Sequence, residues 1–173
     1  MSNRATIETN SETIESLATV IGRVAGVIGH EEFPTGDRAA LKRMSPSSHP
    51  PLAFFRFAFR HLPNGWEFRK QAWMTIVAGI SLMSPHAHRP DIPVGQALAN
   101  SGYSEARLER LLASEKSILH TLVLRAARFL RAKLQPMNWT GIARLLLTGE
   151  TGKREDARIR IASYYYRNLR IKE

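Results

Sequence analysis

Residues 66–83, WEFRKQAWMTIVAGISLM, decide the fold because they hold the longest apolar run of the chain. Their apolar side chains recur at helical spacing and cover most sides of the predicted helix. A helix that is apolar on most sides needs other helices around it, so we expect this one at the centre of the protein. The apolar run itself, 72–83, is too short to cross about 30 Å of hydrocarbon.

The rest of the chain repeats the helical spacing and nowhere alternates with period two over the length of a strand. Clusters of proline, glycine and serine separate the helical segments. The sequence therefore predicts an all-α protein, a helical bundle. The other helices are expected at 11–29, 37–44, 52–62, 94–101, 104–113, 115–134, 138–147 and 154–169, with cap candidates for the first at 9–11.

A loop rich in proline and histidine, SPHAHRPDIP at 84–93, is the best candidate for a boundary between two small helical lobes. We expect an N-terminal lobe at 1–84, a connecting loop at 85–93 and a C-terminal lobe at 94–173. The chain has no cysteine, which excludes disulfides and thiolate metal sites and suits a reducing cytoplasm. Because no apolar run flanked by basic residues opens the chain, we expect a cytoplasmic protein that does not contact membranes.

The formal net charge of +10 is the first indication of function, since such a field attracts polyanions such as nucleic acids. The charge is unevenly distributed. Residues 1–35 carry a net charge of −3, residues 36–62 carry +4, and residues 104–173 hold fifteen basic and seven acidic side chains, a net charge of +8.

The predicted helix 115–134 carries the most regular basic pattern. Ile118, Leu122 and Phe129 are among the apolar residues expected on one side, and arginines at steps of three are expected on the solvent side. Arginine suits phosphate because its planar fork donates paired hydrogen bonds. The candidate nucleic-acid-binding residues in this helix and in other basic clusters are Arg38, Lys42, Arg43, Arg107, Arg110, Arg125, Arg128, Arg131, Arg144, Lys153 and Arg154.

Enzymatic chemistry finds little support in the sequence. His86 and His88 are two residues apart in a loop, whereas helical metal ligands need a spacing of four. The turn at 149–153 has two residues between its glycines instead of the four of a phosphate-binding loop. No pair of carboxylates lies within an apolar segment, as acid–base catalysis would need. We expect no catalytic residue, no metal and no cofactor, and we expect Trp66, Trp73 and Trp139 in the core.

A helix-turn-helix remains the alternative reading. Residues 97–112 have the short helix, the glycine turn, the serine cap and the second helix of that motif, which would make the protein a DNA-binding transcriptional regulator. Leu98 stands where the motif usually has a small residue. Glu105 opens the recognition helix, where it would repel phosphates.

The same residues resemble the CasB family, the small subunit of the type I-E CRISPR surveillance complex, Cascade. Residues 95–102, GQALANSG, and 104–112, SEARLERLL, look like the family's G-x-A-L-A stretch, small-residue turn and R-x-x-R-L-L helix. Residues 36–43, GDRAALKR, resemble its G-x-R-A-x-L-R-R element. Asn138-Trp139 and the basic segment 158–165 follow in the family's order, so the resemblance covers about 36–167.

This resemblance implies a non-catalytic, two-lobed helical subunit that is present as a pair in a ribonucleoprotein. The implied partners are the CRISPR RNA (crRNA), the target and non-target DNA strands, and the other Cascade subunits. The implied role is to stabilise the crRNA–target R-loop and to hold the displaced strand by contacts that do not depend on sequence. Such a role fits because guide pairing supplies the specificity and leaves backbone charge to the small subunit.

Overall fold

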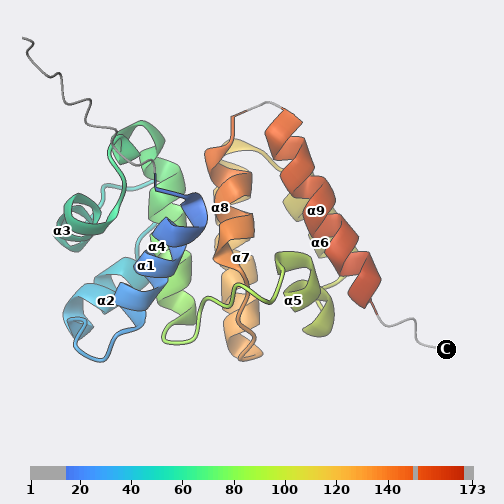
Figure 1. Ribbon diagram of the computed structural model, residues 1–173, viewed down its shortest axis with the longest axis horizontal. Coiled ribbons are helices and arrows are strands. Elements are labelled where there is room, and N and C mark those ends of the chain that lie inside the picture. The colour runs from blue at the N-terminus through green and yellow to red at the C-terminus, as the bar shows by residue number, and fades with distance from the viewer. Residues whose placement is uncertain (1–14, 150–151, 170–173) are drawn as a thin grey trace, which may run out of the picture.

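The computed structural model describes residues 15–149 and 152–169, and within them every regular element is a helix (Figure 1). The predicted all-α class is confirmed. None of the helices in these ranges is both long and apolar enough to cross a membrane. In chain order the elements are α1 (Leu17–Gly29), α2 (Thr35–Lys42), α3 (Leu52–His61), the 3-10 helix η1 (Trp66–Arg69), α4 (Lys70–Met83), α5 (Val94–Asn100), α6 (Glu105–Ala113), α7 (Lys116–Ala132), α8 (Trp139–Leu147) and α9 (Gly152–Asn168).

Side-chain caps fix the start of three helices. The oxygens of Ser16, Ser104 and Asn138 accept hydrogen bonds from the backbone N–H groups that α1, α6 and α8 leave free in their first turns. Helix α1 thus begins at Leu17, later than the expected start at residue 11. The cap candidates at 9–11 lie outside the described residues.

Helix α4 lies at the centre, as the apolar run predicted. All its residues from Ala72 to Ser81 are buried, and α1, α2, α7 and α8 pack around it. The expected single helix 66–83 is divided, however, because the backbone at Arg69 (φ −128°, ψ 34°) leaves the helical range between η1 and α4. The three tryptophans are buried, which confirms their expected place in the core.

Two glycines let helices approach closely. A Cβ at Gly79 of α4 would overlap the ring of Trp139, which opens α8 and is fully buried. A Cβ at Gly95 of α5 would overlap the backbone of α9 near Ile161. One hydrophobic core includes residues of both predicted lobes, and the division at 85–93 stays a prediction.

The first test concerns the contact between Gly79 and Trp139. We expect Gly79→Ala to lower the free energy of unfolding by about 1–3 kcal/mol, because an added methyl group would displace the indole ring from a packed core. Gly22→Ala is the matched control, since a Cβ there meets nothing within 4 Å. This control should raise stability by about 0.5–1 kcal/mol, as alanine does in an exposed helix. Urea unfolding measures both, and an unchanged midpoint for Gly79→Ala would contradict the prediction.

Candidate nucleic-acid interface

The arginines of α7 are exposed, but they do not form one straight ladder. Three residues turn a helix by about 300°, so side chains at steps of three drift by about 60° at each step. Arg125 therefore points toward α6 and Arg128 toward solvent, while Arg131 turns toward α4. The apolar side also differs from the expectation, because Ile118 is 63% exposed and Leu119 is buried instead.

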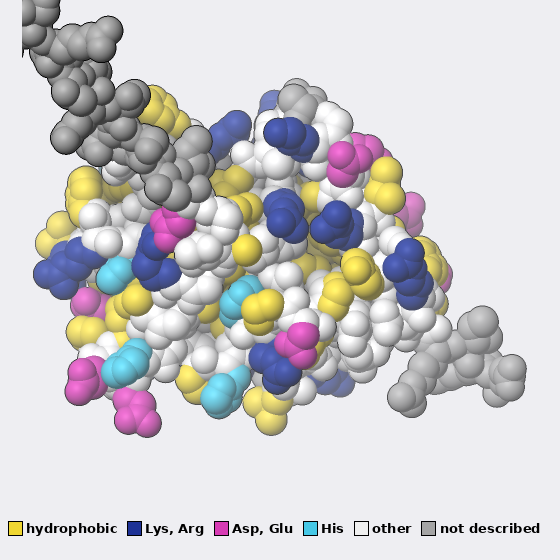
Figure 2. Space-filling view, viewed as in Figure 1, with side chains coloured by type: hydrophobic (Ala, Val, Ile, Leu, Met, Phe, Trp, Pro, Cys, Tyr) yellow, Lys and Arg dark blue, Asp and Glu magenta, His cyan; other side chains and the backbone are white. Residues whose placement is uncertain are grey.

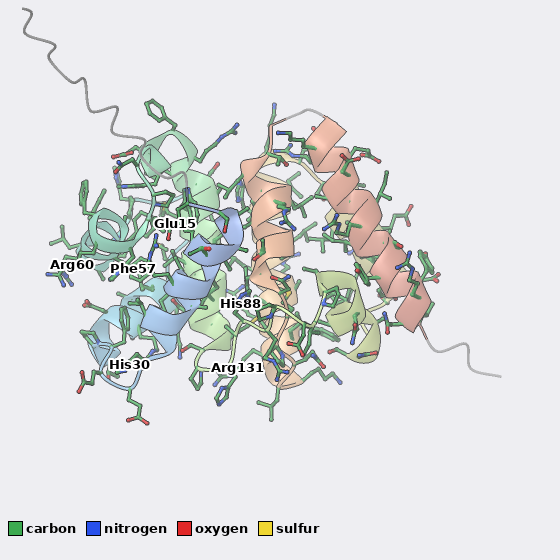
Figure 3. The ribbon with its side chains drawn as sticks, in the orientation of Figure 1. Glu15, His30, Phe57, Arg60, His88 and Arg131 are labelled. Carbon is green, nitrogen blue, oxygen red and sulfur yellow. The ribbon has the colours of Figure 1, made fainter. Side chains whose placement is uncertain are left out.

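Arg131 is engaged within the protein. Its Nη1 donates hydrogen bonds to the backbone oxygens of Leu82 (3.2 Å) and Ser84 (2.7 Å), where α4 ends. Carbonyl groups at a helix C-terminus lack a partner within the helix, so the guanidinium satisfies hydrogen bonds that the fold would otherwise leave unmade. Figure 3 shows Arg131 at the end of α7, beside the loop that follows α4.

A hollow of about 340 Å³ gathers basic side chains from four elements. Two cations come from the junction of η1 and α4, one from α7 and one from α9. No carboxylate of the described residues lines this hollow. We call it the basic pocket and define it by Phe68, Arg69, Lys70, Lys116, His120 and Arg154.

Three helices begin at the basic pocket. Lys70 is the first residue of α4, Lys116 is the first of α7, and Arg154 lies in the first turn of α9. Neither α4 nor α7 has a side-chain cap. The first N–H groups of α7 have no partner in the described residues, and they meet the same hollow as the cations and the positive ends of the helix dipoles. This combination favours an anion.

Two polar groups of the basic pocket have unused hydrogen-bonding capacity. The Nε of Arg154 is buried and has no partner in the described residues. The hydroxyl of Thr75 forms hydrogen bonds with the backbone oxygen of Gln71 (2.9 Å) and with Nδ1 of His120 (2.8 Å), and Nε2 of His120 has no partner in the described residues. Burial, and then the charge of Arg154, lower the pKa of His120 below its usual range.

A second hollow, of about 560 Å³, lies between α8 and α9 and is here called the α8–α9 groove. Arg144, Lys153 and Arg160 line it, together with one acidic residue, Asp156. A more open hollow at the start of α9 shares Gly149 with the basic pocket and shares Lys153 and Asp156 with this groove, so the three adjoin. Dark-blue side chains gather over α8 and α9 on the face that Figure 2 draws.

A third hollow, the α6–α7 groove, has a volume of about 320 Å³ and holds three predicted residues, Arg107, Arg110 and Arg125. The guanidinium of Arg107 lies over the rings of Tyr103 (6.0 Å) and Phe129 (5.5 Å), which hold it in place. The structure therefore brings together cations that are fifteen or more residues apart along the chain.

The predicted cluster on α2 lines none of these hollows. Arg38 donates to the backbone oxygens of Ile28 and His30 at the end of α1, at distances of 2.9–3.1 Å. Lys42 is half-buried and Arg43 is exposed. Arg38 thus serves the end of α1 much as Arg131 serves the end of α4.

Within the described ranges, none of the cations that line the three hollows forms an ion pair with a carboxylate. The ion pairs that do form engage Arg23, Arg56, Arg89 and Arg158. Four of the arginines and lysines that line these hollows were not among the predicted residues: Arg69, Lys70, Lys116 and Arg160. The sequence did not single out Arg69 and Lys70, because Glu67 and Asp91 reduce the net charge of residues 63–103 to +1.

The alternative sites have simpler roles. Nδ1 of His88 accepts the backbone N–H of Trp139 (3.1 Å) and so caps α8, and no group of three possible metal ligands occurs in the residues that the structure describes. The helix-turn-helix residues form α5, a turn at Gly102 (φ 77°) and α6. Glu105 and Glu109 are exposed on α6 and would repel phosphates from its surface.

The comparison with protein families identifies the family of the chain. No curated protein matches the chain. The family model for CRISPR-associated protein Cse2 matches residues 37–166, which is most of the chain. This match confirms the resemblance to CasB, which is the same family, and does not favour the helix-turn-helix regulator. The chain therefore belongs to the CRISPR-associated Cse2 family, whose members are Cascade subunits.

Proposed function

We propose that the protein binds nucleic-acid backbone without sequence preference inside a CRISPR Cascade complex. In this role it stabilises the crRNA–target R-loop and holds the displaced DNA strand. The observation that carries the proposal is the chain of hollows around the start of α9, in which basic side chains face one another without pairing with described carboxylates. Clefts lined by charges of one sign concentrate counter-ions, so these hollows should attract anions such as the phosphates of nucleic acid.

The chemistry of these hollows suits phosphate more than base edges. Arginine and lysine side chains together with free backbone N–H groups recognise phosphate oxygens, which are the same at every nucleotide. The basic pocket offers these groups from three helix starts, and the α8–α9 groove continues the positive surface past Lys153. Sequence specificity is then supplied by pairing with the guide RNA.

The α6–α7 groove is a second contact for the same or another strand. Arg107 rests on two aromatic rings, so little side-chain entropy is lost when a phosphate binds it. We further propose that the protein assembles with the other Cascade subunits and with a second copy of itself, in the cytoplasm. The half-buried Lys42 and the exposed Arg43 remain candidates for these contacts or for nucleic acid.

The second test removes three cations of the basic pocket. The triple variant Arg69→Gln, Lys116→Gln, Arg154→Gln should bind single-stranded DNA at least about tenfold more weakly at low salt, equally on unrelated sequences. Each phosphate contact contributes about −0.7 to the slope of log affinity against log salt for a single strand, so the slope should become shallower by about 2. Fluorescence anisotropy at several salt concentrations measures both quantities.

The matched control is Arg56→Gln, Arg60→Gln, Arg89→Gln, which removes the same net charge outside the hollows. Arg60, for example, lies on α3 and points away from the body of the protein (Figure 3). If this control loses as much affinity as the basic-pocket variant, only the net charge matters and the proposed interface is wrong. A salt-independent affinity of the unchanged protein would contradict the proposed function itself.

The third test follows the protonation of His120. Arg69, Lys70, Lys116 and Arg154 face this histidine, so a bound phosphate should oppose their charge and raise its pKa from the lowered value. Since the complex then binds protons more tightly, affinity should increase as the pH falls from neutral through the pKa of His120 in the complex, and should level off below its pKa in the free protein. A rise of one pKa unit would correspond to about tenfold in affinity.

Histidine NMR titrations with and without an oligonucleotide measure this pKa directly. His88 is the internal control. Burial lowers its pKa as well, but it lies beside α8 and lines none of the hollows. The pKa of His120 should rise on binding while that of His88 stays constant. Equal shifts of both, or none, would show that no phosphate lies beside His120.

A further inference from the structure

Phe68 is the most exposed large apolar side chain in the described part of the protein. Its side chain is 91% exposed, although burying a phenylalanine would contribute about 1.5–3 kcal/mol to stability. Each of the other six phenylalanines packs against an aromatic ring. Phe68 has no such partner among the described rings, so its faces are open.

The position of Phe68 distinguishes it from an isolated exposed residue. It lines the basic pocket and directly precedes two of the pocket's cations, Arg69 and Lys70. It belongs to η1, where its N–H donates to the backbone oxygen of Gly65 (3.1 Å) and the neighbouring Trp66 is anchored in the core. The ring therefore stands on a short, fixed element at the side of the basic pocket.

We propose that Phe68 is a stacking platform for the base of an unpaired nucleotide whose phosphate lies in the basic pocket. This inference rests on the proposed function and adds that the pocket takes a single strand in preference to a duplex. An aromatic ring stacks on any base because every base has a π-face, so the contact requires no particular sequence. Bases within a duplex already stack on one another and present no free face to the ring.

The chemistry of the pocket favours a nucleotide over a simple anion or an apolar partner. A free phosphate would use the cations and leave the ring in water. An apolar protein segment would cover the ring but would bring no charge to Arg69, Lys116 and Arg154. A nucleotide can cover the ring with its base and pair with the cations through its phosphate, because only a sugar separates the two groups.

The fourth test compares Phe68→Ala, Phe68→Leu and Phe68→Trp in the full-length chain, with a 20-nucleotide single strand and the corresponding duplex as probes. The alanine and leucine variants should bind the single strand about fivefold or more weakly, while duplex affinity changes by less than about twofold. Tryptophan should restore the affinity. The salt slope should not change, because no phosphate contact is removed.

Two further measurements distinguish stacking from a loss of structure. A strand with 2-aminopurine should lose fluorescence when it binds the unchanged protein or the tryptophan variant, and should keep it with the leucine variant. A strand without bases but with the same phosphates should bind all variants equally. Leu134→Ala, which removes another exposed side chain (84%) outside the basic pocket, should bind like the unchanged protein.

The outcomes separate the two proposals. If the unchanged protein binds in a salt-dependent manner but Phe68→Ala binds the single strand equally well, the stacking platform is wrong and the proposed function stands. Equal losses on single strand and duplex would also overturn it. If Phe68→Ala instead impaired only the assembly with other Cascade subunits, the ring would be a protein contact. Failure of the unchanged protein to bind any nucleic acid would overturn both proposals.

Discussion

The contact between Trp139 and Gly79 is the constraint on which the basic pocket depends. Without a side chain at position 79, the indole ring lies directly on α4, and α8 packs against the helix at the centre of the protein. The pocket takes two cations from the junction of η1 and α4, and two from α7 and α9. These side chains face one another only because the second half of the chain is held closely against the first.

The fold class could be predicted because hydrophobic spacing is a local signal that tertiary contacts reinforce. The run 72–83 specified a buried helix, and the side-chain caps at Ser104 and Asn138 marked the starts of two others. The break at Arg69 could not be predicted. Over the four residues of η1, the spacing of a 3-10 helix and that of an α-helix are nearly the same, and only packing decides between them.

The site was less predictable, because its hollows join segments that are distant in sequence. Helical spacing identified Arg107, Arg110 and Arg125, yet it could not tell a free arginine from one that another helix uses. Arg131 donates to the carbonyls at the end of α4, and Arg38 does the same for α1. Which carbonyls an arginine can reach is set by the neighbouring helix, and periodicity within its own helix contains no information about that neighbour.

Helix polarity separates two uses of the same residue type in this protein. Guanidinium groups at helix C-termini meet free carbonyls and the negative end of the dipole, so they stabilise the fold. The cations of the basic pocket lie at three helix N-termini instead, where each is unfavourable by about 0.3–1 kcal/mol and each repels the others. Packing around α4 offsets this cost in the free protein. Because a bound anion would reduce this repulsion, we expect a phosphate-containing ligand that occupies the basic pocket to stabilise the folded state as it binds.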